Sequence, residues 1–181
     1  GQYAFFKCTN LTAIDLGDGV ATIGNYAFSG CTKVDFINID SIEAWYNTKF
    51  VGYTSNPTNA GADIYDENGK VTEAYLPEGM TTIPANIFYG CTSIEKVVIP
   101  EGVTTIPKYA FRYHTGLENV VLPESLSTID IYAFDGCTGL EKIWIPVSVN
   151  TINSNAFNGC AILNIHGIAN SYAQEYAETN N

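Results

Sequence analysis

The segment CTSIEKVVIPEGVTTIPKYAF, residues 91–111, decides the fold because two similar segments follow it in the chain. HTGLENVVLPESLSTIDIYAF covers residues 114–134, and CTGLEKIWIPVSVNTINSNAF covers residues 137–157. Each copy starts 23 residues after the one before it. A fixed period of about 20 to 50 residues is the signature of a solenoid, in which each unit covers the apolar side of its neighbour.

The same pattern extends over most of the chain. Each unit contains a phenylalanine, then a cysteine or histidine three residues later, and then the apolar pattern L-x-x-L-x-L. Period-2 alternation places Val97 and Ile99 inward and Lys96 and Val98 outward. We therefore expect a parallel sheet with equivalent side chains in columns, and a second ladder formed by the short Val-Thr-Thr-Ile segments on the opposite wall. The phenylalanines of the units are Phe5, Phe28, Phe88, Phe111, Phe134 and Phe157.

These units resemble the BspA-like leucine-rich repeats of bacterial surface and secreted proteins, whose pattern is I-P-x-x-V-x-x-I-x-x-x-A-F-x-x-C-x-x-L. Five units of the chain fit this pattern closely. The resemblance implies an α/β-type repeat, a right-handed leucine-rich-repeat solenoid made mostly of short β-strands and turns. It also implies adhesion or protein binding at a cell surface or in a secreted protein, and it implies no chemistry.

The period fails between residues 40 and 70. Asp40-Ser41-Ile42-Glu43 has the D-x-x-E spacing of a capping box, which predicts a helix from about residue 42 to 47. Asn68-Gly69 lies between β-like runs and predicts a hairpin, because both residues accept positive φ. We expect the chain to rejoin the sheet at Val71, as the strand that follows residues 34–39.

The chain is expected to form a single leucine-rich-repeat domain, residues 1–181. The first residue falls inside a repeat unit, so we expect the N-terminus to be a cut in a longer protein and the C-terminal cap, with a helix at about 172–178, to be a natural end. The expected parts are N-terminal repeats at 1–39, an inserted helix, loop and hairpin at 40–70, regular repeats at 71–160, and the cap at 161–181.

Composition excludes several classes of partner. The formal net charge is −11, and the eight lysines and arginines are scattered along the chain. Both features disfavour binding to nucleic acid or to anionic lipid, where clustered cations are required. No apolar run approaches the roughly 18 residues that are needed to span a bilayer.

The column of five cysteines with His114 in its middle is not expected to bind zinc. Parallel side chains in a straight row do not converge tetrahedrally, and β-carbons that point the same way disfavour a disulfide between adjacent turns. We expect buried structural thiols. Catalytic motifs and calcium-loop spacing are absent from the sequence, so we expect no enzymatic activity, no cofactor and no metal. Two columns of glutamates, Glu78/Glu101/Glu124 and Glu95/Glu118/Glu141, are interpreted as solvated faces.

The outward residues of the strands are the candidate binding site. One predicted row is Asp15, Asn38, Tyr75, Val98, Val121 and Trp144, and beside it run Ala13, Phe36, Glu73, Lys96, Asn119 and Lys142. An exposed row of aromatic and aliphatic side chains is typical of a protein-contact surface. An equal alternative is that these residues simply favour strands, or that the inserted segment folds over the row. The candidate partner-binding residues are Phe36, Tyr75, Val98, Val121, Trp144, Lys96 and Lys142.

We therefore expect a non-enzymatic module that binds an unidentified host or bacterial surface protein through its strand face, in a bacterial cell-surface or secreted protein. Two other functions stay open, a passive structural spacer and a glycan-binding module that uses the same aromatic residues.

Overall fold

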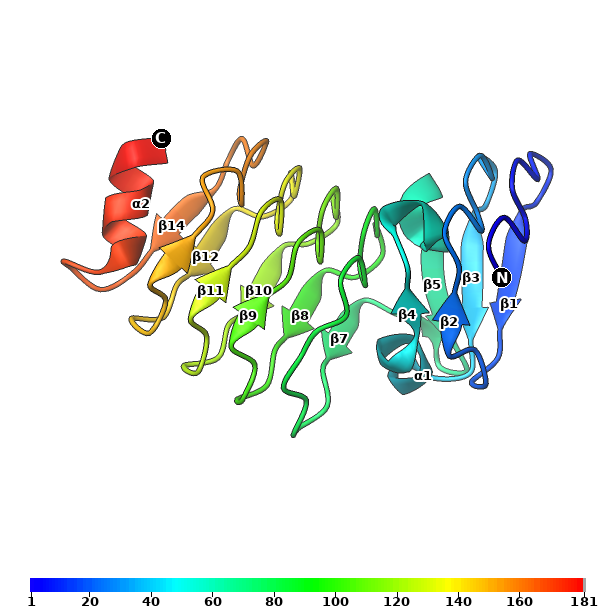
Figure 1. The fold of residues 1–181 in the computed structure, drawn as a ribbon, viewed down its shortest axis with the longest axis horizontal. Helices are drawn as coiled ribbons and strands as arrows, with labels where there is room; N and C mark the ends of the chain where they lie inside the picture. Colours follow the sequence, from blue (N-terminus) through cyan, green and yellow to red (C-terminus); the bar gives the residue numbers. More distant parts are fainter. Residues whose placement is uncertain (181) are drawn as a thin grey trace.

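The computed structural model describes residues 1–180, which form a solenoid with two walls of short strands (Figure 1). The predicted solenoid is confirmed. The first wall, here called the strand wall, contains β1 (Ala13–Leu16), β3 (Phe36–Ile39), β5 (Asp63–Asp66), β7 (Glu73–Tyr75), β8 (Lys96–Val98), β10 (Asn119–Val121), β12 (Lys142–Trp144) and β14 (Asn164–His166). The opposite wall contains β2 (Thr22–Ile23), β4 (Lys49–Phe50), β9 (Thr105–Ile106), β11 (Thr128–Ile129) and β13 (Thr151–Ile152).

Equivalent residues of successive units lie side by side, as the 23-residue period predicts. In the sheet β7-β8-β10, Tyr75 is in register with Val98, which is in register with Val121. The second predicted ladder is also present, with Ile106, Ile129 and Ile152 in register on the opposite wall. β12 pairs with β14, and it lies next to β10 in space although the ladder is interrupted there.

A stack of phenylalanine rings runs through the turns between the two walls. Ring centroids are 5.6 Å apart for Phe88 and Phe111, 5.0 Å for Phe111 and Phe134, and 5.2 Å for Phe134 and Phe157. The backbone follows the same column, because the Phe111 N–H donates to the Ala133 carbonyl of the next turn at 2.9 Å. Burial of the rings and backbone pairing therefore repeat together, once per unit.

The cysteine column extends this pattern. The Cys137 thiol donates to the Phe111 carbonyl at 2.9 Å, and the Cys160 thiol donates to the Phe134 carbonyl at 3.1 Å. His114 replaces a cysteine and is fully buried, and its Nε2–H donates to the Ile94 carbonyl at 2.8 Å. Burial lowers the pKa of His114 to about 3, so the ring is neutral near pH 7.

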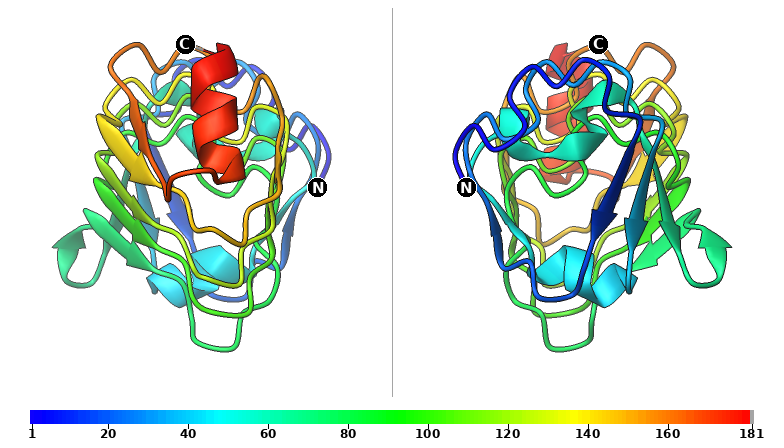
Figure 2. Two further views of the ribbon diagram at one scale, coloured as in Figure 1. Left: turned by 90° about the vertical axis from the view of Figure 1, so that its left-hand side faces the viewer. Right: turned by 90° about the vertical axis from the view of Figure 1, so that its right-hand side faces the viewer.

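The predicted helix and hairpin are both present between residues 40 and 70. α1 (Ile42–Asn47) has the expected bounds, but its N-cap is Ser41, one residue later than the predicted capping box, and the Ser41 hydroxyl accepts from the Ala44 N–H. Two short 3₁₀-helices follow β4, η1 (Tyr53–Ser55) and η2 (Pro57–Ala60). β5 and β6 (Gly69–Lys70) then form the hairpin, and this segment projects from the strand wall (Figure 2).

The predicted order of strands across this region is wrong. The strand next to β3 is β5, with Ile37 in register with Ile64, 27 residues further along the chain. On the opposite wall β4 pairs with β2, with Ile23 in register with Phe50. Because Ile64 and Phe50 supply the buried positions of both walls, the segment from α1 to β5 is a full turn of the solenoid. β6 pairs with the free edge of β5, and the Val71 N–H still donates to the Ile64 carbonyl at 2.8 Å. The next strand, β7, begins only at Glu73 and pairs with β8 alone.

The hairpin divides the solenoid into an N-terminal block, residues 1–66, and a C-terminal block, residues 71–180, whose sheets are separate (Figure 1). The blocks are held together by side chains that donate to turn carbonyls. The Trp45 Nε1–H donates to the Ile87 carbonyl at 3.0 Å, and Asn56 Nδ2 donates to the same carbonyl at 3.0 Å. The Thr58 hydroxyl donates to the Tyr89 carbonyl at 2.7 Å. These contacts are here called the joint.

The C-terminal end of the solenoid is covered by α2 (Tyr172–Asn180), which lies across the last turn (Figure 2). Ala173 and Tyr176 are its buried residues, and the Tyr176 ring lies edge-on to Phe157 at 6.0 Å. The predicted capping helix is therefore confirmed. Within residues 1–180, no helix is both long and apolar enough to cross a membrane.

Candidate partner-binding face

The candidate face is the C-terminal part of the strand wall. Tyr75, Val98 and Val121 are consecutive members of one parallel sheet, and their neighbours along each strand, such as Val97, are buried. Tyr75 is 54% exposed and Val121 is 45% exposed, whereas Val98 is half-buried between them. The alternation of the short strands therefore fixes an apolar row on a rigid backbone.

Trp144 continues this row on β12. It is 57% exposed, and its indole stacks on the His166 ring of β14 with 6.3 Å between centroids and an interplanar angle of 11°. The stack covers one face of the indole and leaves more than half of the residue open to solvent. Exposed tryptophan and tyrosine on a fixed scaffold are the residue types that most often dominate binding energy.

The other end of the row carries a polar network. Lys96 Nζ donates to the Tyr75 hydroxyl at 2.8 Å, lies 5.0 Å from the centre of the Tyr75 ring, and is 3.5 Å from Glu73 Oε2. The Tyr75 hydroxyl in turn donates to the Glu73 carboxylate. This hydrogen bond, together with the charge of Lys96, lowers the pKa of Glu73. Lys142 is exposed and makes no ion pair with any of residues 1–180.

Phe36 does not join the other candidate residues. It lies on β3 in the N-terminal block, where it is in register with Asp63, and its ring meets Tyr65 edge-on at 6.3 Å. The row of Asn38 continues to Tyr65 and not to Tyr75. The predicted continuous row is therefore divided by the hairpin, and its longer part runs from Tyr75 to Trp144.

The inserted segment does not cover the row. Trp45 and Tyr46 of α1 are almost fully buried inside the solenoid, and Trp45 packs against Phe50 at 5.0 Å. Tyr75, the member of the row nearest to the hairpin, keeps 54% of its side chain exposed. The alternative that the segment folds over the strand face is therefore wrong.

A second aromatic cluster lies on the turns and is not among the predicted sites. The Arg112 guanidinium lies 4.6 Å from the centre of the Tyr113 ring and 4.8 Å from that of Tyr132, and its Nε donates to the buried Asp135 carboxylate at 2.6 Å. Because rings and a carboxylate already surround the guanidinium, this cluster joins successive turns and offers no open cation. Its sequence signal is a tyrosine two residues before the phenylalanine, at Tyr3, Tyr26, Tyr109 and Tyr132, all with positive φ.

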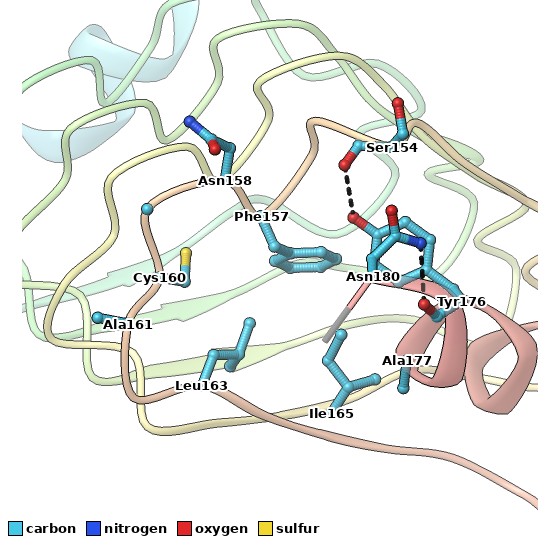
Figure 3. Close-up of a pocket in the computed structure, with 11 residues that line it drawn as sticks. Ser154, Phe157, Asn158, Cys160, Ala161, Leu163, Ile165, Tyr176, Ala177 and Asn180 are labelled. Carbon is cyan, nitrogen blue, oxygen red and sulfur yellow. Dashed lines mark hydrogen bonds between the residues drawn. The ribbon is translucent and has the colours of Figure 1, made fainter.

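A cavity of about 270 Å³ lies where α2 leaves part of the last turn uncovered (Figure 3). Phe157, Leu163 and Ile165 give it an apolar wall, and Cys160 lies at its side. Its described lining contains no histidine, lysine or carboxylate, so it holds no base beside the thiol. Across residues 1–180, no group of three or more His, Cys, Asp or Glu side chains is placed to hold a metal ion.

The repeat, the two ladders and the helical cap define a leucine-rich-repeat protein. The chain belongs to the family described as the BspA type leucine-rich repeat region, which matches residues 1–57 and 58–177 in six copies. The family resemblance seen in the sequence is thereby confirmed. A search of curated protein sequences finds no match.

Solved bacterial structures share this fold. A leucine-rich repeat protein from Bacteroides ovatus is 30% identical with a TM-score of 0.65, and the match covers 93% of this chain and 40% of that one. A leucine rich cell surface protein from Faecalibacterium prausnitzii is 21% identical with a TM-score of 0.52, over 98% of this chain and 65% of that one. The pneumococcal vaccine antigen PcpA is 21% identical with a TM-score of 0.52, over 86% of this chain and 51% of that one. The chain thus spans less than half of the Bacteroides protein.

Proposed function

We propose that this chain is a non-enzymatic binding module that docks a partner protein on the C-terminal part of its strand wall. The observation that carries the proposal is the row of Tyr75, Val121 and Trp144. Each is 45% to 57% exposed, and the alternate residues of their strands are buried in the core. The contact residues are Tyr75, Val98, Val121 and Trp144, with Lys96 and Lys142 at the rim.

Rigidity supports this function. The strands of the row are paired in register, and their inward residues belong to one buried core, so the face is already formed before a partner arrives. A preformed face loses little conformational freedom when it binds, and the interface backbone moves little in such complexes. We place the module at a bacterial cell surface or in a secreted protein. The name of the Faecalibacterium protein, whose fold is shared, is consistent with this location.

The experiment is a binding screen of the chain against arrays of purified host and bacterial surface proteins, with a glycan array beside them. The double variant Tyr75→Ala/Trp144→Ala removes the two most exposed aromatic residues of the row. The double variant Val51→Ala/Tyr53→Ala is the control, because it removes exposed side chains that follow β4 on the other side of the solenoid.

We expect protein hits that weaken at least about tenfold in the Tyr75/Trp144 variant and persist in the control, since truncation of an aromatic anchor costs about 2 kcal/mol or more. Hits confined to the glycan array indicate a glycan-binding module instead. An absence of hits on both arrays indicates a spacer. Protein binding that survives the Tyr75/Trp144 substitution excludes this face.

A further inference from the structure

The net charge of residues 71–160 is confined to the strand wall and its two borders. This surface holds seven glutamates and two lysines, a net charge of −5, whereas the remaining surfaces of the same residues hold two acidic and two basic side chains. The glutamates are Glu73, Glu78, Glu95, Glu101, Glu118, Glu124 and Glu141, and the lysines are Lys96 and Lys142.

The glutamates form a column on each side of the apolar row. One column, Glu95, Glu118 and Glu141, lies immediately before β8, β10 and β12. The first column is tightly spaced, because the Glu118 N–H donates to the Glu95 carbonyl of the neighbouring turn at 2.8 Å. Glu78, Glu101 and Glu124 border the other side, each three residues after a strand, and all six side chains are exposed.

Most of these carboxylates make no ion pair with a lysine or arginine of residues 1–180. Of the seven, Glu73 alone lies within ion-pair distance of a lysine, at 3.5 Å from Lys96. Like charges stacked at the spacing of adjacent strands repel one another. Lys96 and Lys142 lie between the first column and the apolar row, and they offset part of its charge. The face therefore presents an apolar strip, Tyr75 to Trp144, with net negative charge on both sides.

We propose that the occupant of this face is a cationic polypeptide, one that places lysine or arginine on both sides of an apolar or aromatic contact. The inference rests on the proposed function, and it assigns the chemistry of the partner by charge complementarity. The same field repels anionic surfaces, so polyanionic glycans, nucleic acid and anionic lipid are disfavoured. A neutral glycan gains nothing from the two acidic columns.

The test is a library of random 12-residue peptides displayed on phage and selected on the immobilised chain. We expect the selected peptides to be cationic, to carry at least one aromatic or large aliphatic residue, and to bind more weakly as salt rises from 0.05 M to 0.5 M, because salt screens exposed charges. Synthetic copies of these peptides are then titrated against variants of the chain.

The decisive variant is Glu95→Lys/Glu118→Lys/Glu141→Lys, which reverses one column and leaves the apolar row intact. The matched control is Glu43→Lys/Glu175→Lys/Glu178→Lys, which changes the net charge equally at exposed positions on α1 and α2. We expect the first variant to bind selected peptides about 10- to 100-fold more weakly than the control does. Thermal unfolding of both variants verifies that they fold.

The outcomes separate this inference from the proposed function. If the selected peptides lose binding to Trp144→Ala but bind both triple variants equally, the proposed docking face stands and the cationic partner is overturned. Selected peptides that are neutral or acidic overturn it as well, and so does a selection that enriches none. Peptides that bind Trp144→Ala as well as the unchanged chain overturn the face itself.

Discussion

At the regular turns and at the joint, equivalent turn carbonyls accept hydrogen bonds, but the donor groups differ. Between regular turns, a backbone N–H donates to the carbonyl just before each stacked phenylalanine, as when Phe111 donates to Ala133. At the joint, the equivalent carbonyl of Ile87 accepts from the side chains of Asn56 and Trp45. The acceptors continue across the boundary unchanged, and only the donors differ. A solenoid therefore tolerates an irregular turn when side chains take over the donors that the backbone no longer offers.

The irregular turn has a local cause. η2 begins with Pro57, which has no N–H, and the Asn56 side chain caps this 3₁₀-helix by accepting from the Thr58 N–H at 3.0 Å. The Asn56 side chain thus accepts a hydrogen bond through Oδ1 within its own turn and donates through Nδ2 across the joint. The two turns are also in close contact at the joint, since a β-carbon on Gly90 would lie 2.9 Å from the Asn59 α-carbon. The regular interface is repeated and redundant, whereas the joint depends on a few individual side chains.

The largest expected effect is in the centre of the regular stack. Phe111→Ala empties a fully buried position between Phe88 and Phe134, and we expect it to lower the free energy of unfolding by about 3 to 5 kcal/mol. Phe5→Ala is the control, because Phe5 occupies the same repeat position but is 45% exposed, and its expected cost is below about 1.5 kcal/mol. Urea unfolding measures both. Equal losses would show that ring burial does not govern the stack.

The joint is tested by Asn56→Asp. This change keeps the acceptor that caps η2, but it removes the donor to the carbonyls of Asn86 and Ile87, which are 2.7 Å and 3.0 Å from Nδ2. We expect a loss of about 2 to 4 kcal/mol, since two buried carbonyls lose a partner and face a carboxylate. Hydrogen exchange should show residues 42–66 opening before the C-terminal block. Asn59→Asp, on the exposed side of η2, is the control and should change little.

The buried His114 is expected to make the stability of the regular turns depend on pH. Its folded pKa of about 3 lies below the usual 6.5, so the unfolded chain binds a proton more readily, and the stability contributed by the neutral ring is complete above pH 6.5 and is lost as the pH falls toward 3. His114→Cys restores the cysteine of the repeat. We expect the variant to lose about 2 to 3 kcal/mol less than the unchanged chain between pH 7.5 and pH 4.5. Parallel pH profiles of the two proteins would contradict a buried neutral histidine.

Much of the regular block could be predicted because one period fixes many positions. The columns of Ile106, Ile129 and Ile152, and of Tyr75, Val98 and Val121, follow from counting 23 residues. α1 and the hairpin followed from local signals, a cap before an apolar run and Asn-Gly between strands. In each case the physical information lies within a few neighbouring residues or in their exact repetition.

The turn from α1 to β5 could not be predicted in the same way. It shares no motif with its neighbours, and its wall residues Phe50 and Ile64 are recognised only by their pairing with Ile23 and Ile37. The Asn56 and Thr58 donors likewise have meaning only beside Ile87 and Tyr89. The division of the candidate row, which separates Phe36 from Tyr75, is a consequence of this turn. Long-range pairing of this kind leaves no local trace.

The joint also bears on how such a chain can change its length during evolution. Units within residues 91–157 meet equivalent partners on both sides, so copying or deleting one 23-residue unit by recombination recreates the backbone contacts between turns. The turn containing Asn56 meets a different surface on each side, so a second copy placed beside the first finds no matching carbonyls. Changes of length are thus confined to the regular units, and the length of the binding row can vary while the joint stays single.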